Sequence, residues 1–389
     1  MKIANRMDRL SESITIAITT LSKQLKADGK DVLSFSAGEP DFGTPQVIKD
    51  AAIKAMENNE TTYTAVEGTV ACREAICQKL KRDNNLDYTI NEVIANNGAK
   101  HTLFNIFQAG IEEGDEVIIP APYWVTYPEL VKYSGGTVVE IITDDKSNFK
   151  ITPEQLEAAI TPKSKMLVLT TPSNPTGSVY SREELTAIAD VLKDTNITVI
   201  SDEMYEKLVY GDAEFTAVAS INEDMLNRTI TVNGLSKSVA MTGWRFGYAA
   251  CKDQNLMKAM KKLQSQSTSN INSITQSASI TALDGSADTD IESMRVEFEK
   301  RRDLACELMN NINGLSVSKP DGAFYLFVNI KEITNDSMEF SKGLLEDVGV
   351  AVVPGVAFGL EGYFRLSFAT DEATIKDGIS RIKKFVDAK

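Results

Sequence analysis

The chain is poor in histidine, since His101 is the only one among 389 residues. A zinc site built from several histidines, such as the pair of an H-E-x-x-H helix, is therefore excluded. A serine–histidine–aspartate triad would have to use His101 itself. Long apolar runs are also missing: none approaches the roughly 18 residues of a membrane-spanning helix, and the N-terminal MKIANRMDRLSES lacks the apolar core of a signal peptide. We therefore expect a cytoplasmic protein that does not enter a membrane.

Positive charge and paired cysteines are scarce as well. The chain has 41 Lys and Arg against 55 Asp and Glu, a formal net charge of −14. This balance repels polyphosphates, so nucleic acid is not expected as a partner. The cysteines form no C-x-x-C pair, which favours reduced, mostly buried thiols. The remaining composition, 42% hydrophobic and 25% charged, is typical of a globular protein.

The middle of the chain alternates short apolar runs with helical patterns, which is typical of an α/β fold with a mostly parallel sheet. The runs predict a seven-stranded sheet whose strands begin at Val93, Glu116, Thr137, Lys165, Thr198, Thr229 and Arg245. Between them, capping-box patterns predict helix starts at Thr152 and Ser181. The first forty residues contain no run of this kind.

The pattern changes from about residue 290 onward. A long charged helix is expected around residues 293–310, followed by the β-rich stretches GAFYLFVNI, VAVVPG and YFRLSFA and a last amphipathic helix. We predict a large domain over residues 46–289, with its sheet flanked by helices. A smaller α+β domain would combine residues 1–45 with residues 290–389.

Two polar residues after predicted strands carry chemical information. Lys237 stands between two serines in SKSVAMTGWRFGY, either as a solvated loop lysine or as a partly desolvated Schiff-base lysine. Asp202 ends the strand in TVISDEMYEKL. A carboxylate there can keep the ring nitrogen of a pyridine cofactor protonated, although a helix N-cap explains Asp202 equally well when it is taken alone. Together the two residues favour a pyridine cofactor.

Two turns after other strands fit the same cofactor. Asn174 lies in the rigid turn PSNPTG and could donate to the phenolic oxygen of a bound ring. The segment from Gly98 to Lys100 links a strand to a helix, where free N–H groups and a cation can hold a phosphate. Each turn alone is also explained as an ordinary connection.

Taken together, these residues resemble the class I aminotransferases of the fold-type I pyridoxal-phosphate family. The resemblance covers nearly the whole chain. The family's motifs occur in order as SFSAGEPDFGTP, TYTAVEG, NNGAKHTLF, PYWVTYPE, PSNPTG, SDEMYE, NGLSKSVAMTGWRFGY, GAFY and YFRLSFA. It implies a fold-type I α/β transferase with pyridoxal 5′-phosphate as its cofactor.

The resemblance also implies roles for single residues. Lys237 would hold the cofactor and act as the catalytic base, with Asp202 at the ring nitrogen and Tyr205 at the phenolic oxygen. The other residues implied to bind the cofactor are Ala99, Lys100, Trp124, Asn174, Ser236, Arg245 and Tyr63. Among these, Tyr63 would reach the phosphate of the neighbouring subunit, so the resemblance implies a homodimer with shared active sites.

For amino and keto acid substrates, the resemblance makes Arg365 the bidentate partner of the α-carboxylate. The residues implied to bind the substrate are Gly38, Trp124, Asn174, Arg365, Ser13, Thr15, Lys100 and Tyr325. Many aspartate aminotransferases use an arginine from the other subunit for the distal carboxylate, but residues 263–294 contain no arginine or lysine. The chain is instead similar to a bacterial subgroup in which hydroxyls and a lysine take this role, at Ser13, Thr15 and Lys100.

The reaction expected from this resemblance is ping-pong amino transfer from aspartate to 2-oxoglutarate. A broader alanine, aromatic or prephenate aminotransferase is the alternative. Prephenate is less favoured because Ser11 and Glu12 stand where the subgroup has a basic residue. A carbon–sulfur lyase could share the same lysine, aspartate and arginine. A non-enzymatic regulatory module would need a DNA-binding extension, of which the sequence gives no sign.

Overall fold

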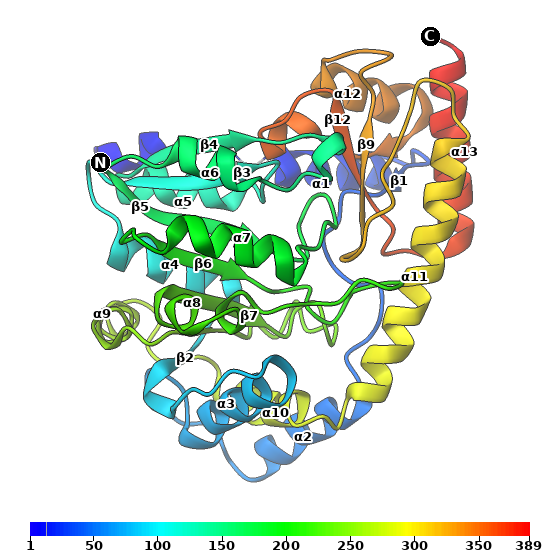
Figure 1. Ribbon diagram of the computed structural model, residues 1–389. Helices are drawn as coiled ribbons and strands as arrows, with labels where there is room; N and C mark the ends of the chain where they lie inside the picture. The colour runs from blue at the N-terminus through cyan, green and yellow to red at the C-terminus, as the bar shows by residue number, and fades with distance from the viewer. Residues whose placement is uncertain (13) are drawn as a thin grey trace.

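The computed structural model describes residues 1–12 and 14–389, with Thr15 described by its backbone alone. Its centre is a seven-stranded sheet in the order β2-β8-β7-β6-β5-β3-β4 (Figure 1). The strands are β2 (Val93–Asn96), β3 (Glu116–Ala121), β4 (Thr137–Ile142), β5 (Ser164–Thr170), β6 (Thr198–Asp202), β7 (Thr229–Gly234) and β8 (Gly247–Ala250). The predicted strands are all present. The pairs between β4 and β7 are parallel, and β8 is antiparallel to both of its neighbours.

The strand predicted from Arg245 begins two residues later, at Gly247. Arg245 has a φ of 58°, in the left-handed region. A residue in that conformation cannot continue an extended strand, so the strand starts only after it. The position of Arg245 in this turn also places its side chain at the site described below.

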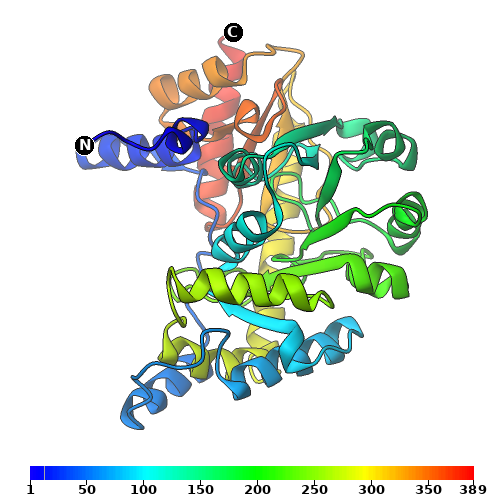
Figure 2. The ribbon, with the colours of Figure 1, turned by 90° about the vertical axis from the view of Figure 1, so that its left-hand side faces the viewer.

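Helices cover both faces of the sheet (Figure 2). Alternate residues of a strand face opposite sides, so Val117 and Ile119 pack with one helix layer and Ile118 with the other. The first layer contains α4 (Ala99–Gly110), α5 (Thr126–Ser134) and α9 (Gln254–Ser265). The second contains α2 (Gln46–Glu57), α3 (Val70–Asn84), α6 (Pro153–Ala159), α7 (Arg182–Leu192), α8 (Glu223–Arg228) and α10 (Ser273–Leu283).

Both predicted capping boxes are confirmed. The Thr152 hydroxyl accepts the Gln155 N–H at 3.3 Å, and the Ser181 hydroxyl accepts the Glu184 N–H at 3.2 Å. Each satisfies an N–H group that has no acceptor inside its helix. The predicted apolar face of α7 is buried in the core, at Leu185, Ile188, Ala189 and Leu192.

The C-terminal part forms the three-stranded antiparallel sheet β11-β12-β9. Its elements are α11 (Asp288–Asn310), β9 (Tyr325–Asn329), α12 (Ser337–Val348), β10 (Val350–Ala351), β11 (Val353–Pro354), β12 (Tyr363–Ser367) and α13 (Glu372–Asp387). The N-terminal segment joins this part, because β1 (Leu33–Ser34) pairs in parallel with β10. Ahead of it lie the 3₁₀-helix η1 (Asn5–Arg9) and α1 (Ile14–Ala27). The short remaining 3₁₀-helices are η2 (Ile90–Glu92), η3 (Asp145–Ser147), η4 (Val218–Ser220) and η5 (Gly355–Phe358).

The two-residue strand β1 was not predicted, because it has too few residues to show a pattern and exists only through its pairing with distant β10. The exact boundaries of the two domains stay a prediction. Within the described part of the chain, no helix combines the length and the apolar character needed to cross a bilayer.

A buried carboxyl lies beyond the end of β6. Glu203 is fully buried, and its Oε1 accepts from the Ser201 hydroxyl at 2.8 Å and the Val218 N–H at 3.2 Å. Its Oε2 has no hydrogen-bond partner among the described residues. Burial, reinforced by the charge of Glu206, raises the pKa of Glu203 to about 8.

Replacing Glu203 with Gln is expected to remove a pH dependence of stability. The folded-state pKa of Glu203 lies above its ordinary value of 4.5. Between pH 4.5 and about 8, the folded protein therefore keeps a proton on Glu203 that the unfolded chain has lost. The Glu203 contribution to the free energy of unfolding is full below that window and is lost as pH rises through it, by up to about 1.4 kcal/mol per pH unit. Urea unfolding from pH 5 to 9 should show this slope for the natural chain and a flatter one for Glu203→Gln. Exposed Glu346→Gln is the control; equal slopes in all three proteins would mean that Glu203 is ionised when folded.

Candidate active site

A cavity of about 480 Å³ opens at the carboxyl ends of the central strands. In α/β sheets, ligands bind at this edge. The predicted site residues that line the cavity are Gly38, Ala99, Lys100, Trp124, Asn174, Asp202, Tyr205, Ser236, Lys237, Arg245, Tyr325 and Arg365. Tyr63 is not among the lining residues; its side chain is 90% exposed. Ser13 and the side chain of Thr15 lie outside the described residues.

Lys237 lies in the turn that follows β7 and is half-buried. Its Nζ donates a hydrogen bond to the Gly38 carbonyl. Burial lowers the pKa of Lys237 to about 8, although the negative charge of nearby Glu39 acts in the opposite direction and raises it. A substantial fraction of the amine is therefore neutral near physiological pH, as a nucleophile or base requires.

Asp202 ends β6 and is 4% exposed. Its Oδ2 accepts from the Tyr127 hydroxyl at 2.7 Å, and its Oδ1 accepts from the Met204 N–H at 3.3 Å. Burial raises the pKa of Asp202 to about 6, while the Tyr127 hydrogen bond acts in the opposite direction. A buried carboxylate on the cavity wall is a suitable partner for a cationic ring nitrogen.

The start of α4 forms one end of the cavity. Its first N–H groups have no acceptors within the helix, and Ala99 and Lys100 both line the cavity. Gly98 has a φ of 83°, and a Cβ there would clash with the Arg245 guanidinium, so glycine lets the cation approach the helix start. Arg245 is held by a hydrogen bond to the Thr242 carbonyl at 2.8 Å. This turn fits a phosphate group.

Arg365 lies on β12 and is 3% exposed. Its Nη1 donates to Asn174 Oδ1 at 2.9 Å and its Nη2 to the Ser36 carbonyl at 2.8 Å. Its Nε has no hydrogen-bond partner among the described residues, although the atom is buried. A buried guanidinium with an unused donor fits a substrate carboxylate.

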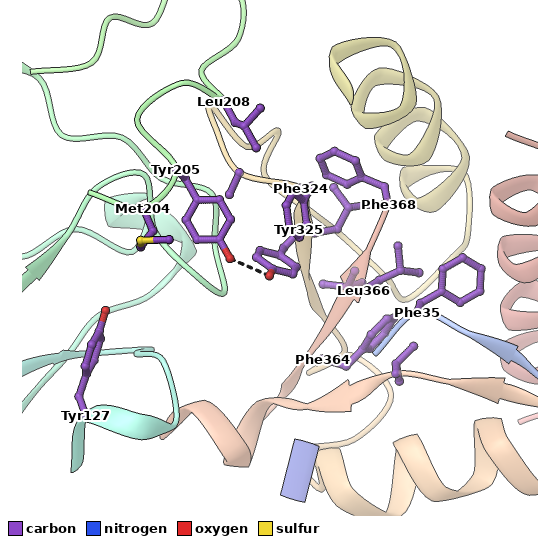
Figure 3. Packing of buried hydrophobic residues seen from close by; sticks show 14 of the residues in the cluster. Phe35, Tyr127, Met204, Tyr205, Leu208, Phe324, Tyr325, Phe364, Leu366 and Phe368 are labelled. Carbon is purple, nitrogen blue, oxygen red and sulfur yellow. Dashed lines mark hydrogen bonds between the residues drawn. The ribbon is translucent and has the colours of Figure 1, made fainter. Parts of the chain in front are cut away.

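Two aromatic hydroxyls close the wall between these groups. Tyr205 and Tyr325 meet hydroxyl to hydroxyl at 2.8 Å, from the segment after β6 and from the start of β9 (Figure 3). The Tyr325 ring also lies beneath the Arg365 guanidinium, 4.4 Å from its centroid. The Lys100 Nζ lies 5.0 Å from the Trp124 ring centroid on another wall. The cavity thus has separate places for a phosphate, a planar ring and a carboxylate.

Sequence reasoning missed several residues of the wall. They are Thr19, Ser36, Ala37, Glu39, Tyr127, Thr170, Met204 and Thr242. Tyr127 follows Trp124 by three residues, a spacing that places both on one side of a helical turn. That spacing was the available signal, but it does not reveal that the hydroxyl reaches Asp202, 75 residues away.

Comparison with known proteins gives consistent matches over the full chain. The family model "Aminotransferase class I and II" matches residues 30–382. The aspartate aminotransferase of Bacillus subtilis is 46% identical, with 100% of this chain and 99% of that protein aligned. A probable aspartate/prephenate aminotransferase of Aquifex aeolicus is 44% identical over 99% of this chain and 98% of its own length.

The fold comparison agrees. The crystal structure of the aspartate aminotransferase from Rhizobium meliloti superposes with a TM-score of 0.96 at 41% identity, covering 100% of this chain and 99% of that one. The Thermus thermophilus aspartate aminotransferase with maleate gives 0.95 at 39% identity, covering 99% and 100%. The chain therefore belongs to the class I and II aminotransferase family.

Proposed function

We propose that this chain is an aspartate aminotransferase that uses pyridoxal 5′-phosphate and passes the amino group to 2-oxoglutarate. The observation that carries the proposal is one cavity that brings together a half-buried amine at Lys237, a buried carboxylate at Asp202 and a buried guanidinium at Arg365. The family generally uses this cofactor. Its relatives from Bacillus subtilis and Rhizobium meliloti are named aspartate aminotransferases.

The residues present fit the cofactor. Lys237 would hold it, and the Gly98–Lys100 turn with Arg245 and Ser236 would bind its phosphate. Asp202 would face the ring nitrogen. The other groups that would surround the ring are Trp124, Asn174 and Tyr205. When bound, the cofactor supplies an electron sink for the bond electrons at the substrate α-carbon.

Lys237 would carry the protons of the reaction. With a pKa lowered to about 8, its Nζ can be neutral at physiological pH and can remove the α-proton of an amino acid in the cavity. The resulting ammonium can then return that proton. The cation of Arg365 nearby helps to keep the pKa low, after the larger effect of burial. The two half-reactions would follow one another with the first product leaving before the second substrate binds.

Arg365 would orient both substrates by their α-carboxylates. The Nε is unused, and the remaining Nη hydrogens add donors in the same plane. Asn174 and the Ser36 carbonyl hold the guanidinium in place, so little ordering remains to be done when a carboxylate binds. Tyr325 lies next to both Gly38 and Arg365 in the same wall.

The preference for aspartate rests on a second cation. Lys100 lines the cavity and could meet a distal carboxylate; the hydroxyls of Ser13 and Thr15 stay a prediction for the same role. Stopped-flow half-reactions of the holoenzyme with aspartate, glutamate, alanine and phenylalanine should favour aspartate over alanine and phenylalanine by more than about tenfold, or ~1.4 kcal/mol. The reverse order would reject the assignment.

Prephenate is the second candidate acceptor, because the Aquifex aeolicus relative is named a probable aspartate/prephenate aminotransferase. Adding prephenate to the aminated holoenzyme in the same experiment measures this reaction directly. Efficient amino transfer to prephenate, within about threefold of 2-oxoglutarate, would make the chain a dual-specificity enzyme.

We further propose a homodimer with shared active sites. The exposed Tyr63 could reach the cavity of a partner subunit, and exposed apolar side chains of α2 and α3 accompany it, at Val47, Ile53, Met56 and Val70. The division into domains at residues 46–289 and the cytoplasmic location stay predictions of the same proposal.

A further inference from the structure

Hydrogen bonds link the side chains of Thr170, Tyr127 and Asp202 into a short relay that ends on Asp202. Tyr127 lies in the first turn of α5, with 1% of its surface exposed, and its hydroxyl meets Asp202 Oδ2 at 2.7 Å. The same hydroxyl lies 2.9 Å from Thr170 Oγ1 at the end of β5. Thr170 and Asp202 are register partners on neighbouring parallel strands. The Tyr127 hydroxyl therefore bridges the carboxyl ends of two strands in the wall of the cavity.

The direction of the relay follows from counting protons. An ionised carboxylate only accepts hydrogen bonds, and a tyrosine hydroxyl has one proton to give. Tyr127 therefore donates to Asp202, and its oxygen must accept from Thr170. Burial raises the pKa of Tyr127 well above its ordinary value, so the donated proton stays on the tyrosine. The opposite direction would require a protonated Asp202.

The relay counters the cost of burying the carboxylate. Burial raises the pKa of Asp202. The Tyr127 hydrogen bond is the strongest influence that lowers this pKa, ahead of the Met204 N–H and the charge of Lys237. A hydrogen bond to an ionised acceptor is about twice as strong as one between neutral groups. The Tyr127 ring is fixed in turn by an edge contact with Trp124, at 5.5 Å and 85°.

We propose that Tyr127, supported by Thr170, is a positioning residue that keeps Asp202 ionised and aimed so that it selects a cofactor with a protonated ring nitrogen. The inference rests on the proposed function, since it needs pyridoxal phosphate in the cavity. Tyr127 acts through Asp202. Its removal should therefore weaken the recognition of the ring nitrogen more than the binding of the rest of the cofactor.

The test compares two ligands on the full-length apoprotein by absorbance titration: pyridoxal 5′-phosphate and its 1-deaza analogue, in which carbon replaces the ring nitrogen. The natural chain should prefer pyridoxal phosphate. This preference is measured as the ratio of the two dissociation constants. In Tyr127→Phe, which keeps the ring packing, the ratio should fall by about tenfold, or ~1.4 kcal/mol. Thr170→Val should narrow it less, by about threefold, because Tyr127 can still donate to Asp202. If Tyr127→Phe does not fold, Thr170→Val provides the test in its place.

Tyr180→Phe is the matched control. Tyr180 is buried, and its hydroxyl accepts the Ile151 N–H at 3.0 Å away from Asp202. Its removal should leave the ligand preference unchanged. If Tyr127→Phe weakens both ligands equally, Tyr127 is merely structural and the inference is overturned while the proposed function stands. If the natural chain binds both ligands equally, the assigned role of Asp202 falls with the inference; if it binds neither, the proposed function falls as well.

Discussion

Lys237→Ala is expected to lower the rate of amino transfer by at least ~10⁴-fold. The substitution removes the amine that would hold the cofactor and the base that would move the α-proton, and the Gly38 carbonyl loses its donor. The visible absorption band of lysine-bound pyridoxal phosphate should vanish, while far-UV circular dichroism stays unchanged. Single-turnover rates with aspartate measure the loss.

A surface lysine provides the control for this substitution. Lys252 donates to the Asp87 carbonyl at 2.8 Å and to Glu92, away from the cavity, so Lys252→Ala should keep both the band and the rate. Added methylamine should restore part of the activity of Lys237→Ala, because a small amine can take the place of the missing base. An unchanged band in Lys237→Ala would contradict the assignment and point to Lys100, the other lysine lining the cavity.

Arg365→Lys is expected to lower kcat/KM for aspartate and for 2-oxoglutarate alike, by about 10² to 10³-fold, or ~3 to 4 kcal/mol. A lysine has a single charged nitrogen and cannot offer the paired donors of a guanidinium. It would also leave Asn174 and the Ser36 carbonyl without the donor that each now has. Steady-state kinetics with both substrates measure the effect.

Arg302→Lys is the matched control. Arg302 is buried and donates to the Pro320 carbonyl at 3.2 Å, but it does not line the cavity. Its replacement tests what the loss of a buried arginine does to folding in general. A primary amine without a carboxylate gives the second comparison. If Arg365→Lys slows the reaction of that amine as much as that of aspartate, Arg365 does not bind the α-carboxylate.

Much of the fold could be predicted because its signals are local. The central strands are short apolar runs, and the two capping boxes bring together residues only three apart, as at Ser181 and Glu184. The motif residues Lys237 and Asp202 could be selected because Asp202 ends a buried strand and Lys237 follows another. Strand ends of a parallel sheet meet at one edge, so such residues converge.

The contacts that define the site could not be predicted from the sequence. Arg365 donates hydrogen bonds to Asn174 and to the Ser36 carbonyl, which are 191 and 329 residues away along the chain. The segment around Ser36 is positioned by β1, which pairs with β10. No local sequence pattern predicts this pairing. Tyr127 was missed for the same reason, since its partner Asp202 lies on another strand.

The sequence by itself determined the scarcity of histidine, the net charge of −14, the strand and helix pattern and the residue types available for chemistry. The tertiary structure decided how these residues meet and how they ionise. Cations gather at one cavity of an acidic chain, at Lys100, Lys237, Arg245 and Arg365. The physical reason is that pKa values and hydrogen-bond directions depend on burial and on neighbours distant in the chain, which only the folded packing supplies.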